Sequence, residues 1–65
     1  MTGETVRRLR HARNLSQHEL AMLAGLHYHT IERVERGRRV SRGTLRAIAR
    51  ALDVSLDDLE TEAVA

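Results

Sequence analysis

The 65-residue sequence contains no cysteine, proline, lysine, phenylalanine or tryptophan. The absence of cysteine excludes disulfide bonds and thiolate metal sites, so neither can supplement the small hydrophobic core of so short a chain. We therefore expect one domain over residues 1–65 that is stabilised by side-chain packing alone. A domain of this size cannot enclose a deep cleft or a lid.

Long apolar segments are also absent. No run approaches the roughly 20 apolar residues that span a bilayer, and the first residues lack the apolar stretch of a secretory signal. These two observations predict a soluble cytoplasmic protein that has no contact with a membrane.

The residue groups of a metal centre or an enzyme are missing as well. His27 and His29 are two residues apart, a spacing that points helical side chains away from each other, and His11 and His18 fall in other predicted elements. No nucleophile, base and orienting group occur together. We therefore expect no metal, no cofactor, no small-molecule substrate and no catalysis.

Charge is divided unevenly along the chain. Residues 1–52 hold all eleven arginines against four glutamates, a net charge of +7, whereas residues 53–65 hold five acidic residues and no basic one, a net charge of −5. The basic part is suited to binding a polyanion. The exclusive use of arginine favours forked contacts with phosphates and guanine edges, although a GC-rich genome would give the same composition.

The stretch over residues 16–37 predicts two short helices joined by a sharp turn. Ser16 and Glu19 have the spacing of a capping box, so a helix is expected to begin directly after Ser16. Gly25 can adopt the left-handed conformation that ends this helix. The second helix is expected over 28–36.

Three further helices are predicted on either side of this pair. A narrow apolar stripe indicates a helix over 3–13, with Thr2 as its expected cap. Ser41 and Ser55 stand ahead of apolar residues at helical spacing, which predicts one capped helix after each of them. Residues after 60 show no clear apolar period, so 61–65 are expected to fray.

Alternating strand patterns are absent, and the helix signals agree with one another. The sequence therefore predicts a compact all-α domain of five helices with an ordered core over about 3–60. Its central residues are expected to be Leu9, Leu20, Ile31, Val34, Leu45, Ile48, Leu52 and Leu59. Met22 and Leu23 widen the apolar surface of their helix, where they either pack against neighbouring helices or contact a partner protein.

These motifs resemble the lambda-repressor-like, or Xre-type, helix-turn-helix DNA-binding family. The resemblance rests on Ser-Gln-x-Glu-Leu-Ala at 16–21, on Gly25, on Thr-Ile at 30–31 and on Glu-x-Gly at 35–37, all in one register. It implies a compact five-helix domain of bacterial or phage origin. The second helix of the central pair would enter the major groove, with the N-terminus of the preceding helix against the DNA backbone.

The resemblance also assigns DNA contacts to particular residues. Gln17 would hold a phosphate at the start of its helix, or would simply be exposed there. Tyr28, His29 and Arg33 occupy positions that reach base edges. Arg33 is the strongest of these, because a guanidinium binds guanine O6 and N7 together. Alternatively, Arg33 pairs with His29 or contacts a phosphate.

The other implied contacts have structural alternatives. Thr30 would contact a phosphate or a thymine methyl group unless it is half-buried. Glu32 would accept a hydrogen bond from cytosine unless it forms an ion pair with the residue four positions later, which we favour. The basic residues near the end of the helix would contact phosphates or form a solvated loop: Arg36, Arg38, Arg39 and Arg42.

Arg10 and Glu35 match a pair that this family commonly joins as a structural ion pair between its first and third helices. His27 departs from the family, which usually has serine or threonine at this cap, and an imidazole is a weaker cap. Tyr28 and His29 replace the small or amide residues often found at the reading positions. The base preference therefore cannot be copied from a relative.

The resemblance implies a sequence-specific regulator of transcription that binds double-stranded DNA, a repressor that recognises a near-palindromic operator as a homodimer. The dimer contact is expected around Val40, the helix start after it, and Leu56–Leu59. The alternative is a protein-interaction module, such as an antitoxin or an anti-repressor-like domain, that uses Met22, Leu23 and the acidic end over 56–65. Only DNA binding should weaken steeply with added salt.

Overall fold

The part of the chain that the structure describes contains five α-helices and no strand. The computed structural model describes the backbone of residues 2–64 and the side chains of residues 2–60. In chain order the helices are α1 (Thr2–Ala12), α2 (Gln17–Ala24), α3 (Tyr28–Glu35), α4 (Arg42–Ala51) and α5 (Leu56–Val64). The predicted all-α fold class is confirmed.

Serine side chains cap three of these helices. Ser16 Oγ accepts a hydrogen bond from the Glu19 N–H at 3.0 Å, and the Ser16 N–H donates to Glu19 Oε1 at 2.8 Å, which completes the predicted capping box. Ser41 caps the first turn of α4. Ser55 forms the same reciprocal pair of hydrogen bonds with Asp58 at the start of α5.

Left-handed backbone conformations close the helices. Asn14 (φ 56°) follows α1, Gly25 (φ 70°) follows α2 as predicted, and Gly37 (φ 83°) lies beyond the end of α3. Asp53 (φ 59°) adopts the same left-handed conformation after α4, and the sequence analysis did not predict this. The prediction that Thr2 caps the first helix is wrong, because Thr2 is itself the first helical residue.

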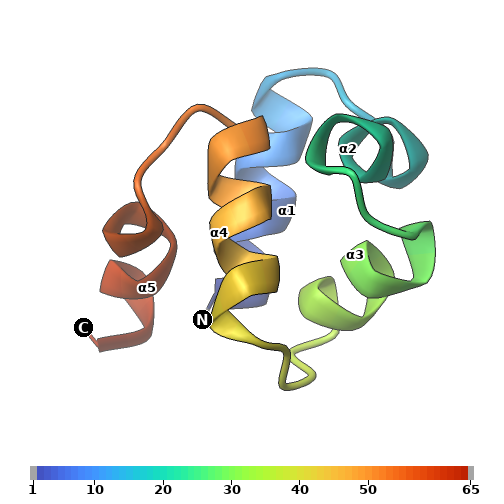
Figure 1. Cartoon of the computed structure of the whole chain (residues 1–65). Helices are drawn as coiled ribbons and strands as arrows, with labels where there is room; N and C mark the ends of the chain where they lie inside the picture. Colours follow the sequence, from blue (N-terminus) through green and yellow to red (C-terminus); the bar gives the residue numbers. More distant parts are fainter. Residues whose placement is uncertain (1, 65) are drawn as a thin grey trace.

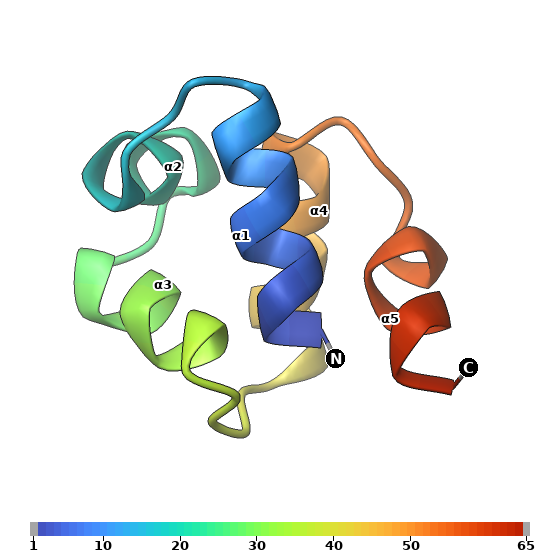
Figure 2. The ribbon, with the colours of Figure 1, turned by 180° about the vertical axis from the view of Figure 1, so that it is seen from behind.

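The two longest helices within residues 2–60, α1 and α4, occupy the middle of the molecule, with α5 on one side and α2 and α3 on the other (Figure 1 and Figure 2). α3 packs against α1 and α2, α4 packs against α2 and α5, and α5 also contacts α1. The buried hydrophobic residues where these helices meet are Val6, Leu20, Ala21, Ile31, Val34, Ile48, Ala49, Leu52 and Leu59.

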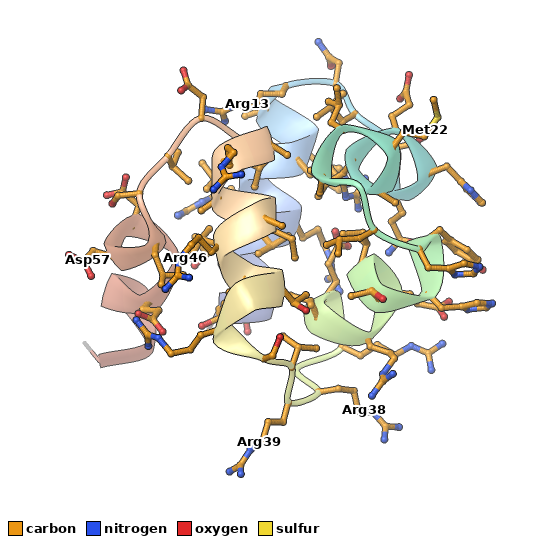
Figure 3. All side chains as sticks on the ribbon, in the orientation of Figure 1. Arg13, Met22, Arg38, Arg39, Arg46 and Asp57 are labelled. Carbon is orange, nitrogen blue, oxygen red and sulfur yellow. The ribbon has the colours of Figure 1, made fainter. Side chains whose placement is uncertain are left out.

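Six of the eight predicted central residues belong to this cluster, whereas Leu9 and Leu45 pack against it and are only half-buried. Of the two alternatives left open for Met22 and Leu23, the first, packing against neighbouring helices, is wrong. Their exposed fractions are 81% and 62%, because this side of α2 faces away from the other helices, as Figure 3 shows for Met22. An apolar pair therefore remains on the outer surface of α2.

The backbone of α5 extends to Val64. The predicted fraying over 61–65 concerns residues whose side chains lie outside those described, and it stays a prediction. Within the described chain, no helix combines the length and the apolar character that crossing a membrane requires.

Gly3 lies where α1 packs against the backbone of α3. A Cβ atom at this position would overlap the Val34 carbonyl oxygen and would lie 3.1 Å from the Glu35 carbonyl oxygen. Both obstacles are backbone atoms, so no change of side-chain rotamer could make room. The absence of a side chain at residue 3 therefore allows α1 to pack directly on the C-terminal half of α3.

We expect Gly3→Ala to destabilise the fold by about 1–3 kcal/mol through this overlap, although alanine is the better helix former. Gly43→Ala is the matched control, because the nearest heavy atom to its added Cβ would be Ser41 Oγ at 3.8 Å. The control should stabilise α4 by up to about 1 kcal/mol. Urea unfolding measures both changes, and a stabilising effect of Gly3→Ala would contradict the close approach.

Candidate nucleic-acid interface

α3 has one face in the core and one face toward solvent. Ile31 and Val34 are buried, as predicted, whereas His29, Arg33 and Arg36 are exposed. Three further residues with predicted DNA contacts are half-buried on the same helix: Tyr28, Thr30 and Glu32. For Thr30 this is the structural alternative that the sequence had left open.

Arg33 differs from the other charged residues on this helix in its hydrogen bonds and ion pairs. Its guanidinium has no hydrogen-bond or ion-pair partner among residues 2–60, so the alternative pairing with His29 does not occur. Instead His29 Nδ1 lies 3.6 Å from Glu32 Oε1, and Arg36 Nη2 lies 3.9 Å from Glu32 Oε2. The predicted ion pair of Glu32 is thus present, and Arg33 keeps all its donors for another molecule.

The loop between α3 and α4 carries further positive charge. Arg38 and Arg39 are exposed, and Figure 3 shows both side chains pointing away from the body of the protein. Arg42, which the sequence analysis grouped with them, instead donates a hydrogen bond to Glu60 Oε2 of α5 at 3.2 Å. Arg42 therefore connects α4 to α5, while Arg38 and Arg39 extend the basic surface of α3.

An imidazole caps α3. His27 Nδ1 accepts a hydrogen bond from the His29 N–H at 3.2 Å, and the two rings stack with centroids 5.0 Å apart. The prediction that these side chains point apart is wrong, because His27 precedes the helix and its ring folds back over the first turn. Within residues 2–60, no three histidine, aspartate or glutamate side chains converge as metal ligands would.

A second ring contact joins α2 to α3. The rings of His18 and Tyr28 are stacked, with centroids 4.2 Å apart and an interplanar angle of 15°. Sequence reasoning considered His18 only as a metal ligand and missed this contact. No local signal could have found it, because the two residues meet only once the turn at Gly25 has set the angle between α2 and α3.

Glu35 connects α3 to the two preceding helices from its inner side. Arg10 Nε donates to Glu35 Oε2 at 2.7 Å and Arg10 Nη2 donates to Glu35 Oε1 at 3.0 Å, so the predicted ion pair is confirmed. Gln17 Nε2 also donates to Glu35 Oε1, at 3.1 Å. Neither role considered for Gln17 included this bond, which joins the start of α2 to the same carboxylate.

These partners keep the buried carboxylate ionised. Burial alone would raise the pKa of Glu35, but hydrogen bonds from Arg10 and Gln17 and the charges of Arg10 and Arg7 outweigh it, so the pKa lies below its usual value of 4.5. Arg7 further donates from Nη2 to the Glu35 backbone carbonyl at 3.2 Å. The inner side of α3 is therefore anchored, which leaves its outer side available for binding.

Comparison with known proteins agrees with this geometry. A family model described as a helix-turn-helix domain matches residues 3–62, almost the whole chain. The chain belongs to the helix-turn-helix family. The predicted resemblance to Xre-type, lambda-repressor-like domains is thereby confirmed, and with it the broad role of a DNA-binding transcription regulator.

Three helix-turn-helix relatives show how far the similarity extends. The control protein C.SmaI of Serratia marcescens is 46% identical over 60 residues, which cover 91% of this chain and 71% of that protein. The crystal structure of the restriction-modification controller protein C.AhdI from Aeromonas hydrophila matches with a TM-score of 0.85 at 42% identity, over 89% of each chain. An HTH_3 family transcriptional regulator from Vibrio cholerae matches with a TM-score of 0.82 at 28% identity, over 92% of this chain and 34% of that one.

The Glu35 contacts predict that this helix-turn-helix domain is sensitive to acid. Because its pKa is lower in the folded than in the unfolded chain, Glu35 contributes stability above the unfolded value, and that contribution is lost as the pH falls below about 4.5. We expect the free energy of unfolding to fall more steeply between about pH 7 and pH 3 in the parent than in Glu35→Gln, with the two curves converging in acid. Parallel curves in urea titrations would contradict this prediction.

Proposed function

We propose that this protein controls the transcription of restriction–modification genes by binding a specific operator through α3. Two of its relatives are named as controller or control proteins, and one of these names refers to restriction–modification. The observation that carries the proposal is the Arg33 guanidinium, which has no partner among residues 2–60 and lies on the outer face of a helix whose inner face is fixed by Glu35. A donor in this position suits the reading of guanine.

In the proposed complex α3 lies in the major groove and α2 crosses above it. Arg33 would form two hydrogen bonds with guanine O6 and N7, while Tyr28 and His29 would contact neighbouring base edges. Arg38 and Arg39 would contact phosphates beside the groove. Gln17 has a second amide hydrogen besides the one bonded to Glu35, and it can donate this hydrogen to a phosphate at the start of α2.

We further propose that the protein binds a near-palindromic operator as a homodimer and represses transcription by occupying it. One small module buries only about 600–1,000 Å² on DNA, so two half-sites are needed for tight binding. Val40 and Leu56 are half-buried and remain suitable for the dimer contact. Leu59 is not suitable, because the core buries it completely.

Selection from a pool of random DNA duplexes tests this function directly. We expect a site with mirrored halves whose centres lie about 10 bp apart, or a multiple of this distance. In a reporter assay, placing that site across a promoter should lower expression. Enrichment of no sequence, or of a site without mirrored halves, would contradict the operator model. A motif absent from the upstream regions of restriction and modification genes would contradict the assignment of target genes.

The exposed pair Met22 and Leu23 favours one other function, that of a protein-interaction module. The dependence of binding on salt separates the two functions. Phosphate contacts release counterions, so log affinity for DNA should fall steeply and linearly with log salt concentration. Affinity for a protein partner through these apolar side chains would change little over the same range.

A further inference from the structure

Four ring side chains form a continuous stack where α2 meets α3. His18 stacks on Tyr28 at a centroid distance of 4.2 Å, Tyr28 contacts His29 at 4.5 Å with the rings tilted by 39°, and His29 stacks on His27 at 5.0 Å. His18 alone comes from α2. The stack therefore connects the outer surface of α2 to the two residues of α3 that have been assigned to base edges.

The stack restricts the ring of Tyr28. A half-buried ring at the start of a helix can ordinarily adopt more than one rotamer. Tyr28 is held from the inside, where it packs against the hydrophobic core, and across one ring face by His18. The ring planes are only 15° apart, so the His18 ring lies face to face with the Tyr28 ring.

We propose that His18 is a positioning residue for base recognition and that it acts through Tyr28. By holding the Tyr28 ring in one orientation, His18 fixes which base edge or thymine methyl group the ring can contact. A side chain on α2 thus influences which base pair is preferred, although the contact with the base is made by a residue of α3. This proposal rests on the proposed function, because it requires α3 to contact bases.

The physical basis is preorganisation. A ring that is already fixed loses little conformational freedom on binding, and it fits one base step better than the others. Without the stack, Tyr28 could turn to suit several base pairs, so the discrimination between them would decrease. A direct contact of His18 with a phosphate would have a different effect, because it would strengthen binding to all sequences by a similar factor.

Three variants test the proposal: Tyr28→Ala, His18→Ala and His18→Phe. Tyr28→Ala, selected on random duplexes beside the parent, identifies the base positions that depend on the tyrosine ring. At those positions we expect His18→Ala to reduce the preference for the favoured base pair by roughly two- to tenfold, the range that corresponds to one aromatic contact. His18→Phe should restore the preference, because phenylalanine can stack but cannot contact a phosphate through a ring nitrogen.

Each other outcome overturns the proposal. Unchanged preferences in His18→Ala would show that Tyr28 needs no support from α2. A uniform loss of affinity that His18→Phe does not restore would assign His18 to a phosphate contact. A loss of stability with no change of base preference would make the stack structural only. If His18→Ala does not fold, His18→Gln removes the ring at little cost in helix propensity and is judged by the same selection.

The selection also separates this proposal from the proposed function. If the parent protein enriches no sequence, the proposed function is wrong and the proposal fails with it. If the parent enriches a site and His18→Ala enriches the same site with the same preferences, only the role of His18 is wrong.

Discussion

Replacing Glu35 by alanine should destabilise the protein by about 3 kcal/mol or more, which is most of the stability that a single core of this size supplies. The substitution removes a carboxylate whose side chain is 2% exposed and leaves the Arg10 guanidinium, 10% exposed, without the two hydrogen bonds that it donates to this carboxylate. It also leaves the Gln17 amide without its acceptor. The midpoint of urea unfolding, followed by circular dichroism, measures the loss.

The control for this prediction replaces both partners with apolar residues of similar volume, as Arg10→Met with Glu35→Leu. A buried ion pair can often be exchanged for apolar packing at little cost, because both charges avoid desolvation. We therefore expect the double variant to be more stable than Glu35→Ala alone. If Glu35→Ala unfolds at the same urea concentration as the parent, the buried pair does not hold α3 to α1.

Replacing Arg33 by alanine should weaken binding to the selected operator without unfolding the domain. Each bidentate contact between arginine and guanine contributes about 1–3 kcal/mol of discrimination, which corresponds to roughly 5- to 150-fold in affinity for each half-site. The exposed side chain has no partner among residues 2–60, so its loss should leave the fold intact. Fluorescence anisotropy with the operator and with a scrambled duplex measures both affinities.

Arg46→Ala is the matched control, because it removes the same charge from an exposed position. Figure 3 shows Arg46 on the side of α4 that faces α5, away from α3. We expect it to leave the ratio of operator to scrambled affinity unchanged, whereas Arg33→Ala lowers that ratio. Equal effects of the two substitutions would mean that Arg33 contributes only its charge and reads no base.

The helix boundaries could be predicted from sequence because they depend on neighbours in the chain. Ser16 and Glu19 are three residues apart, and their reciprocal hydrogen bonds need nothing beyond the first turn of α2. Asn14 and Gly25 adopt left-handed conformations for reasons that are equally local. The pair of Arg10 and Glu35 is not local, and it was found only through the resemblance to a family.

The missed features all depend on how the helices meet. The sequence did not indicate that residue 3 must be glycine. The requirement comes from the Val34 carbonyl oxygen of α3, which a Cβ atom at residue 3 would overlap. The bond from Gln17 to Glu35 joins residues 18 positions apart. Met22 is exposed because it lies on the side of α2 that the other helices do not cover. Such contacts are set by tertiary packing, which periodicity and capping patterns do not specify.

The acidic helix α5 lies at the edge of the molecule opposite α2 and α3 (Figure 1). Residues 53–65 carry a net charge of −5 and the rest of the chain +7, so the acidic segment of the sequence lies on the side of the fold away from α2 and α3. If the domain binds a duplex through α3 as proposed, repulsion between the acidic residues of α5 and the phosphates would favour approaches in which α3 faces the DNA. A larger share of encounters with DNA would then start in the orientation that the proposed complex requires.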